Sequence, residues 1–458
     1  MDNRRQQRLA FIVTAAIFTI LQLLSVVRAP TSVSLAKGTD YWEYLELAAG
    51  IRHGCGFARY VNGVCEQPEI LRTPGYPLFV AIFPNWRVVL FAQALLSGLV
   101  CLLAGIWTGH RWGTLVGCAA QMFIFANIPS FVLSAMLMSE TLFEAVLFLA
   151  ILLPLLQFNR ARGCSSLFVS AATSGVLIGC LSLIRPVAVF IPILGFIPYL
   201  LLDSPAKQKI TAIALTIVIP TAVILGWSVR NYILKGYFGL STVSALNLYL
   251  YRAGGVLALD TGRPLWKVQD AMINEIGAAN LQLYGNEVTP DLAKEMNRRA
   301  LHILASHPLE ATMVTVQGFV WLLVAPSRTM LARLLGTPGG STELGPGSGR
   351  VTVSRIRRIV GQVRQSYVLT ALVVFQFLFV AVVWTGIFRA VRKVPKSSVA
   401  FRAWIIYLLS IATLLLITAS GAEAAVRFRS VVMPLLGIVA AMGYFGEAAH
   451  PPAHIAKD

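Results

Sequence analysis

The stretch Leu9–Val27, LAFIVTAAIFTILQLLSVV, decides the fold class of this chain. It carries no charged residue, and at about 1.5 Å per residue a helix of this length nearly covers a hydrocarbon layer about 30 Å thick. Arg4, Arg5 and Arg8 precede it, as basic residues precede a signal peptide. The apolar run is too long for one and lacks a small-residue cleavage site, so we predict an uncleaved first span with the N-terminus inside.

Similar stretches recur along the 458 residues, of which 57% are hydrophobic and only 13% charged. Soluble domains carry about 25% charged residues, so a water-soluble globule is excluded. The mean hydropathy of +0.71 agrees. We predict an all-α integral membrane protein, a polytopic bundle of about ten transmembrane helices with amphipathic helices on its outer face. The expected spans are 9–27, 88–107, 112–130, 141–157, 166–184, 187–202, 209–229, 366–388, 401–418 and 430–446.

Short basic loops orient these spans. If the N-terminus is inside, all of these loops fall in the cytoplasm, as the positive-inside rule requires. This predicts a multi-pass protein of the inner or plasma membrane, with any active site on the periplasmic or extracellular face. The basic residues are Arg111, Arg160, Arg162, Lys207, Lys209, Arg389, Arg392, Lys393 and Lys396.

One apolar segment is open to two interpretations. Ala311–Ala325 is short, carries Gln317 and ends at Pro326, which favours an interfacial or re-entrant helix. If it spans instead, the bundle has eleven helices and every later residue changes sides. We predict that it does not cross and that Ser397 lies inside.

The chain divides into three parts on this topology. Residues 1–229 form an N-terminal transmembrane module whose outer loops, 28–87 and 131–140, are expected to be catalytic. Residues 230–365 form an outer-face region with interfacial helices. Residues 366–458 hold the last spans and a short cytoplasmic tail.

Two helices and a loop are expected on the outer face. Gly38–His53 reads as an amphipathic helix on the membrane surface, with Glu43 and Glu46 on its polar face. A second helix is predicted to start at Thr289, with Pro290 in its first turn, and to stop before Pro308. Gly336 to Gly349, dense in Gly, Pro, Ser and Thr, is predicted to be a mobile loop.

The net charge of +18 has two explanations. Lys and Arg fill cytoplasmic loops, or they gather an anionic lipid or phosphate. No nucleic-acid-binding motif is present, so nucleic acid is not an expected partner.

The cysteines suggest no metal site. Cys55 and Cys65 flank a Gly-rich turn in the first outer loop, and a disulfide between them is expected if the compartment is oxidising. Otherwise they simply sit in a loop. Most of the others lie in apolar runs as small hydrophobes, namely Cys101, Cys118 and Cys180, while Cys164 lies in a basic loop.

Asp40 and Glu140 stand out among only 20 acidic residues. Each lies at the edge of an apolar run, where a carboxylate can keep a raised pKa and act as a base. The alternative is helix capping, since Asp40 and Ser139 are good residues for a helix N-terminus.

A stiff turn follows in the first outer loop. Arg72-Thr-Pro-Gly-Tyr76-Pro contains two prolines and a glycine, which forbid a regular helix there and present Arg72 and Tyr76. Alone it could be the entrance of a span. With Asp40 and Glu140 in neighbouring loops, it predicts a pocket of carboxylates and a guanidinium.

The order of these motifs resembles that of GT-C glycosyltransferases, in particular the bacterial branch related to dolichyl-phosphate-mannose protein mannosyltransferases and lipid A aminoarabinose transferases. The resemblance covers most of the first 260 residues and the last two spans. One departure is that Tyr41 follows Asp40, where relatives often carry adjacent acidic residues. The motifs are Asp40-Tyr41, Arg72-Thr-Pro-Gly-Tyr-Pro, Ser139-Glu140, Arg185-Pro186, Arg230-Asn-Tyr and Arg427-Phe-Arg.

This resemblance implies transfer of a sugar from a polyprenyl-phosphate-linked donor to an acceptor hydroxyl, with inversion. Asp40 would be the base and Glu140 its orienter, or both would be ligands of a divalent metal ion if one is used. Guanidiniums would hold the leaving phosphate. The expected substrate-binding residues are Tyr41, Glu43, Arg72, Tyr76, Arg230, Asn231, Arg252, Glu423, Arg427 and Arg429.

Several alternatives stay open. A transporter or flippase would favour charged or broken positions within spans and symmetry between halves, and the polar residues here cluster at one face. An oligosaccharide ligase or polymerase would use the same face. The acceptor, whether protein, lipid or glycan, is not indicated. Singly, Arg87, Arg185 and Arg402 are expected to be span-end arginines that reach toward the interface.

Overall fold

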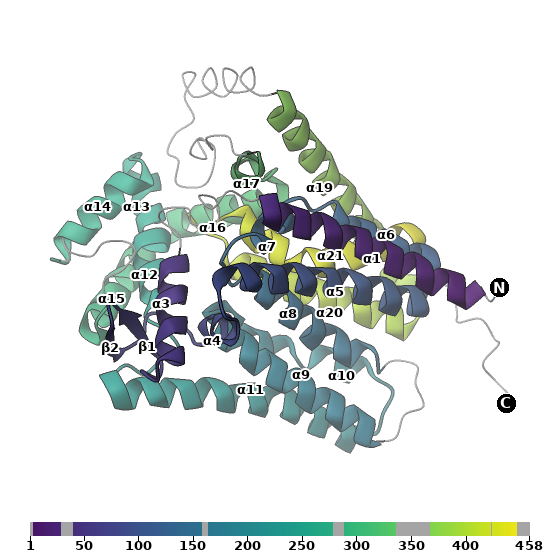
Figure 1. Ribbon diagram of the computed structural model, residues 1–458, viewed down its shortest axis with the longest axis horizontal. Coiled ribbons are helices and arrows are strands. Elements are labelled where there is room, and N and C mark those ends of the chain that lie inside the picture. Colours follow the sequence, from purple (N-terminus) through teal and green to yellow (C-terminus); the bar gives the residue numbers. More distant parts are fainter. Residues whose placement is uncertain are drawn as a thin grey trace.

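The computed structural model describes residues 3–28, 40–157, 164–277, 288–335, 367–422 and 424–446. The described chain is helical apart from one two-stranded antiparallel hairpin. Long helices run along the longest axis of the molecule, among them α1, α5 and α11 in Figure 1. The predicted all-α class is confirmed.

Seven helices in the described ranges are long and apolar enough to cross a membrane. These are α1 (Asn3–Arg28), α5 (Trp86–Trp112), α9 (Cys164–Ile184), α11 (Ala206–Lys235), α19 (Tyr367–Lys393), α20 (Val399–Thr418) and α21 (Val426–Phe445).

The other three predicted spans also fall on helices, but on shorter ones. Prolines and glycines account for the breaks. Pro186 and Pro192 hold one segment in a 3₁₀ conformation, and Pro129 starts a separate helix after a turn. The elements are α6 (Thr114–Phe125) with α7 (Pro129–Ser134), α8 (Glu140–Leu155), and η1 (Pro186–Leu194) with α10 (Ile197–Leu201).

The two ends of the bundle differ. At one end, which we call the open end, Trp112 packs edge-on against Phe401 with 5.4 Å between ring centroids, and Lys393 Nζ donates to the carbonyl of Gly446 at 2.8 Å. Phe11 of α1 reaches the same end, against Gly109. Ser397, in the turn after η3 (Val394–Lys396), therefore lies on the same side as the N-terminal end of α1, as predicted. That this side is cytoplasmic stays a prediction.

The opposite end, which we call the capped end, carries the shorter elements (Figure 1). One group is α3 (Tyr41–Arg52), the hairpin β1 (Ala58–Val61) and β2 (Val64–Pro68), and α4 (Gly75–Ile82). The other is α12 (Val243–Leu246), the π-helix η2 (Asn247–Ala253), α13 (Gly254–Thr261), α14 (Leu265–Glu275) and α15 (Pro290–Ser306), which share a second hydrophobic core.

Both predicted surface helices are present. Thr289 caps α15, its hydroxyl accepting from the backbone N–H of Leu292 at 3.3 Å, and the helix ends before Pro308. α3 runs across the direction of the long helices (Figure 1), as a helix on a membrane surface would. Its predicted polar face is wrong in one respect: Glu43 is only 4% exposed, because an arginine partner draws its carboxylate inward.

The ambiguous apolar segment forms α16 (Pro308–Val324), which stays at the capped end. Gly318 lies directly against Gly421 in the loop after α20. At the C-terminal end of α16, the carbonyls of Leu322 and Ala325 accept from Arg429, which lies in the first turns of α21. The helix therefore does not reach the open end. It is followed by α17 (Arg328–Leu334), and the predicted mobile loop 336–349 lies outside the described residues.

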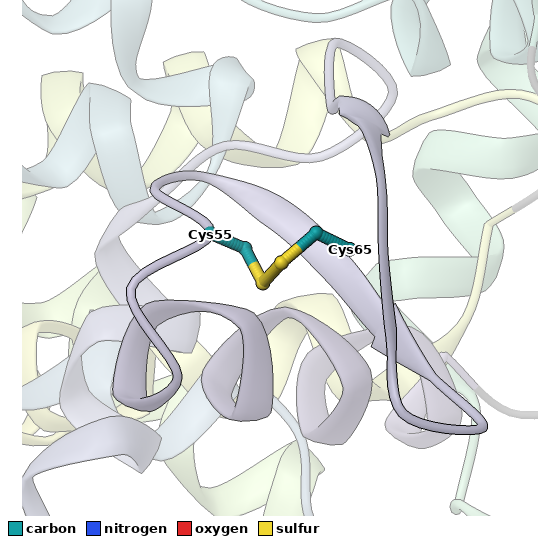
Figure 2. Close-up of a disulfide and its surroundings, with 2 residues drawn as sticks. All are labelled: Cys55 and Cys65. Atoms are coloured by element: carbon teal, nitrogen blue, oxygen red, sulfur yellow. A yellow bond between two sulfur atoms is a disulfide. The ribbon is translucent and has the colours of Figure 1, made fainter.

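Cys55 and Cys65 form a disulfide, with Cα atoms 5.6 Å apart. It joins the end of α3 to strand β2 (Figure 2). The predicted proximity is confirmed, and the bond closes the hairpin onto the helix that carries the candidate site.

Candidate active site

Arg72 forms ion pairs with two carboxylates, one at the N-cap of α3 and one in its first turn. Its Nη2 lies 2.8 Å from Asp40 Oδ1, and its Nε donates to Glu43 Oε2. The Arg72 guanidinium also lies over the ring of Tyr44, 5.8 Å from the centroid. The prediction that the prolines and glycine after Arg72 forbid a regular helix is wrong: α4 starts at Gly75 with Pro74 at its N-cap, because proline is tolerated in the first turn of a helix.

Aromatic side chains pack next to Arg72 and its two carboxylates. Tyr44 packs edge-on against the fully buried Tyr76, at 4.7 Å between centroids. Tyr76 donates its hydroxyl to Gln93 Oε1 at 2.6 Å, so it faces inward instead of being presented by the turn. Tyr41 is also buried and packs against Trp42, with the two rings tilted by 32°. These contacts hold α3 and α4 against α5.

Glu140 forms the second half of the site. It opens α8 with its side chain 1% exposed, and its Oε1 lies 2.8 Å from Arg185 Nη1. Arg427 Nε approaches the same oxygen at 3.7 Å. Arg185 also donates to Ser139 Oγ at 3.1 Å, and the guanidiniums of Arg185 and Arg427 lie over the ring of Phe428, 5.4 Å and 5.0 Å from its centroid. One buried carboxylate is thus shared by two cations.

The two halves are neighbours. Arg185 and Arg427, the partners of Glu140, both lie close enough to Asp40 to influence its carboxyl. Asp40 is 25% exposed and Arg427 33%, whereas Glu140 is enclosed. The predicted grouping of carboxylates with a guanidinium is therefore present, with three guanidiniums in place of one; the predicted pocket stays a prediction. We call Asp40, Glu140, Arg72, Arg185 and Arg427 the charged cluster.

Neither acid serves as a helix cap. Asp40 stands at the N-cap of α3 and Ser139 at that of α8, but neither side chain makes the capping hydrogen bond. The capping explanation is therefore wrong for both positions. The carboxylates are directed at arginines instead.

The expectation of a raised pKa at Asp40 is also wrong. Burial opposes ionisation, but Arg72, Arg427 and Arg185 together outweigh it and lower the pKa of this carboxyl below its usual value. The pKa of Arg72 is raised, because Asp40, Tyr44 and Glu43 outweigh its own burial. The pair is fully ionised at neutral pH.

Two predicted substrate-binding residues donate hydrogen bonds to backbone carbonyls at the capped end. Arg230 donates from Nη1 to the carbonyl of Glu69 at 2.7 Å and from Nη2 to that of Phe57 at 3.2 Å. The buried amide of Asn231 donates to the carbonyls of Gly239 and Leu240. Both residues fasten the end of α11 to nearby loops, and a role in substrate binding stays a prediction.

Two more arginines that were predicted to bind substrate donate hydrogen bonds to carbonyls at the C-terminal ends of helices. Arg252 donates to the carbonyl of Thr418 at 2.7 Å, at the end of α20. Arg429 is 2% exposed and donates to the last carbonyls of α16. Arg252 thus holds the start of the loop that leads to Arg427, and Arg429 holds the end of α16 against α21. Glu423, in that loop, lies outside the described residues.

Sequence reasoning missed Arg185 and Arg59. Arg185 was expected to reach toward the interface, but it pairs with Glu140. The Arg185-Pro186 motif was the available signal, since it places a cation where a span stops. Arg59, in the hairpin, pairs with Glu69 at 2.8 Å, and no sequence pattern predicted this ion pair.

Asp40 and Glu140, the expected ligands of a divalent metal ion, are each paired with a guanidinium, and metal binding by them stays a prediction. The described ranges hold no group of three or more His, Cys, Asp or Glu side chains that could serve as ligands.

Comparison with solved structures finds distant similarity. The Archaeoglobus fulgidus oligosaccharyltransferase in its apo form is 12% identical with a TM-score of 0.48; the match covers 94% of this chain and 50% of that one. ArnT from Cupriavidus metallidurans bound to undecaprenyl phosphate is 14% identical with a TM-score of 0.38, over 95% and 76% of the two chains. This chain thus spans about half the length of the archaeal enzyme. No protein-family model and no curated protein matches it.

Proposed function

We propose that the protein transfers a sugar from a polyprenyl-phosphate-linked donor to an acceptor hydroxyl, with inversion, on the outer face of the membrane. The observation that carries the proposal is the sharing of Glu140 by Arg185 and Arg427. Arg185 lies 2.8 Å from this carboxylate, whereas Arg427 lies 3.7 Å from it and is 33% exposed. A lipid phosphate lying at the interface would accept from the partly exposed guanidinium of Arg427.

Arg185 and Arg427 would hold the phosphate of the donor. As the bond between the anomeric carbon and the phosphate oxygen breaks, the electron pair stays on that oxygen, and guanidiniums stabilise the charge that develops there. The activated ester supplies the driving force. Glu140 would keep both guanidiniums aimed at one point.

Asp40 would take the proton of the acceptor hydroxyl while that oxygen attacks the anomeric carbon from the opposite side. It is ionised at neutral pH and partly exposed, so it is able to accept a proton. Arg72 would orient its carboxylate. The products are the glycosylated acceptor and the polyprenyl phosphate.

A first experiment tests the donor. Lipid that co-purifies with the protein in mild detergent is identified by mass spectrometry, and a polyprenyl phosphate or its sugar ester is expected. Arg427→Met should lower the amount retained, whereas Arg87→Met, which changes an exposed arginine stacked on Trp86, should not. Equal retention by both variants would contradict the assignment of the phosphate site.

A second experiment tests the base. Asp40→Asn keeps the shape and removes the proton acceptor, so transfer should fall at least about a hundredfold while donor binding persists. Asp203→Asn, an exposed carboxylate before α11, is the control. Near-normal transfer by Asp40→Asn would end the assignment, and donor movement without transfer would favour the flippase alternative.

A further inference from the structure

The β1–β2 hairpin is packed tightly against α3. A Cβ atom at Gly50 would lie 1.8 Å from the carbonyl oxygen of Ala58, so the strand touches the backbone of the helix. The Cys55–Cys65 disulfide also joins the loop after α3 to strand β2 (Figure 2). The hairpin is therefore fixed relative to the helix that carries Asp40.

Arg59 is the side chain that the hairpin inserts beneath α3. It is 8% exposed and surrounded by carboxylates. Its Nε lies 2.8 Å from Glu69 Oε2, its Nη1 3.7 Å from Glu46 Oε2, and its Nη2 3.9 Å from Glu43 Oε1. Glu69 in turn accepts from the backbone N–H of Leu71 at 2.5 Å. One guanidinium thus compensates three acids, two of them buried.

Glu43 links Arg59 to the charged cluster. One carboxylate oxygen faces Arg59, and the other accepts from Arg72 Nε. Arg72 Nη2 then holds Asp40. A continuous path of alternating charges therefore runs from the hairpin to the candidate base.

We propose that Arg59 is a positioning residue, which acts through Glu43 to hold Arg72 in the orientation that aims the Asp40 carboxylate. The inference rests on the proposed function for the base, and the packing of the hairpin supplies the fixed point. Without Arg59, Glu43 and Glu69 would be buried with too little positive charge, and at least one of them would bind a proton. Glu43 would then hold Arg72 less firmly.

Other charged groups near this path are few in the described chain. Glu46 and Glu69 face Arg59 directly, Glu66 adds negative charge near Glu46, and Arg230 adds positive charge near Glu69. Tyr44 lies beside Arg72. A proton gained in the absence of Arg59 therefore goes to one of the acidic residues Glu43, Glu46, Glu66 or Glu69.

The test is a double-mutant cycle between Arg59 and Glu43. The proteins are Arg59→Met, Glu43→Gln, the double variant and the unchanged chain. Arg52→Met is the matched control, because Arg52 lies on the same module and donates to the carbonyl of Phe83 instead of pairing with an acid. Arg59→Lys keeps the charge, so it is expected to recover part of the activity and to fold if Arg59→Met does not.

Arg59→Met should lower kcat for transfer by about tenfold or more, with donor KM changed by less than about twofold. Adding Glu43→Gln to it should lower kcat little further, since residues that act along one path are not additive. The activity of Arg59→Met should recover as pH rises and the extra proton is lost. The proposal would be overturned if Arg59→Met transferred sugar at the rate of the unchanged chain. It would also be overturned if the fold losses in kcat of the two single variants multiplied in the double variant.

Infrared spectroscopy of the same proteins tests the inference without a transfer assay. Arg59→Met should gain the absorption of a protonated carboxyl group at neutral pH, and Arg52→Met should not. If that band appears but no protein transfers sugar, the proposed function fails and the link between Arg59 and its acids stands. If Asp40→Asn abolishes transfer but Arg59 and Glu43 act independently, only the positioning role fails.

Discussion

Arg185 Nη1 lies 2.8 Å from Glu140 Oε1, joining the residue after α9 to the first residue of α8. The pair is nearly enclosed, with side-chain exposures of 19% and 1%. Since Arg427 lies 3.7 Å from the same oxygen, three elements far apart in the sequence meet at one carboxylate. Breaking a buried pair leaves an uncompensated charge, which costs about 3 to 5 kcal/mol.

Glu140→Gln should therefore destabilise the fold strongly, because it leaves the buried guanidinium of Arg185 without its paired carboxylate and close to Arg427. Arg185→Met added to it removes one of those charges and should recover part of the lost stability. The measurement is the thermal unfolding midpoint of the single and double variants in detergent. Independent, additive losses would show that the pair is not coupled.

The ion pair of Asp40 with Arg72 predicts a particular pH dependence. Because the pKa of Asp40 is lowered from its usual 3.8, the stability that this carboxylate contributes is present above 3.8 and is lost as pH falls through the lower folded value. The difference in unfolding midpoint between the unchanged protein and Asp40→Asn should stay constant from about pH 7 to 5 and narrow only below about 4.

A gain in the stability of the unchanged protein relative to Asp40→Asn as pH falls from 7 to 5 would mean that the pKa of Asp40 is raised, as its position beside an apolar run suggested. The same profile for Asp203→Asn, whose side chain is exposed, serves as the baseline.

The sequence predicted seven of the ten expected spans, the start of α15 and the meeting of Asp40 with Arg72 because each depends on local pattern or loop order. Hydrophobic runs specify helices, and Thr289-Pro290 specifies a helix start. The partner of Glu140 was not predictable, because an arginine at a span end has the same local pattern whether it faces lipid or a carboxylate. For the same reason Arg230, predicted to bind substrate, was not recognised as a residue that binds the backbone carbonyls on either side of the hairpin.

The Cys55–Cys65 disulfide should matter for activity more than for the membrane bundle. It closes the unit of α3 and hairpin that holds Arg59 against Glu43. Replacing both cysteines by serine should reduce transfer about tenfold or more while the helical content stays unchanged, since removing a native disulfide costs about 2 to 5 kcal/mol locally. The measurements are transfer kinetics and circular dichroism.

Reduction of the unchanged protein should reproduce that loss, and reoxidation should reverse it. The matched control replaces Cys101, a buried free cysteine of α5, by alanine, and it should not respond to the reductant differently from the unchanged protein. Full activity of the doubly substituted protein would show that packing alone holds the hairpin.

Ser397 provides the test of orientation. It lies between α19 and α20 at the open end, the same side as the N-terminal end of α1, and the neighbouring basic residues predict that this end is cytoplasmic. A cysteine at Ser397, introduced after removal of the free cysteines, should resist membrane-impermeant thiol reagents in intact cells and react once the membrane is opened. A cysteine at Lys267, exposed on α14 at the capped end, should react in intact cells. The reverse pattern would place the charged cluster on the cytoplasmic side, because Asp40 and Glu140 lie at the end opposite Ser397.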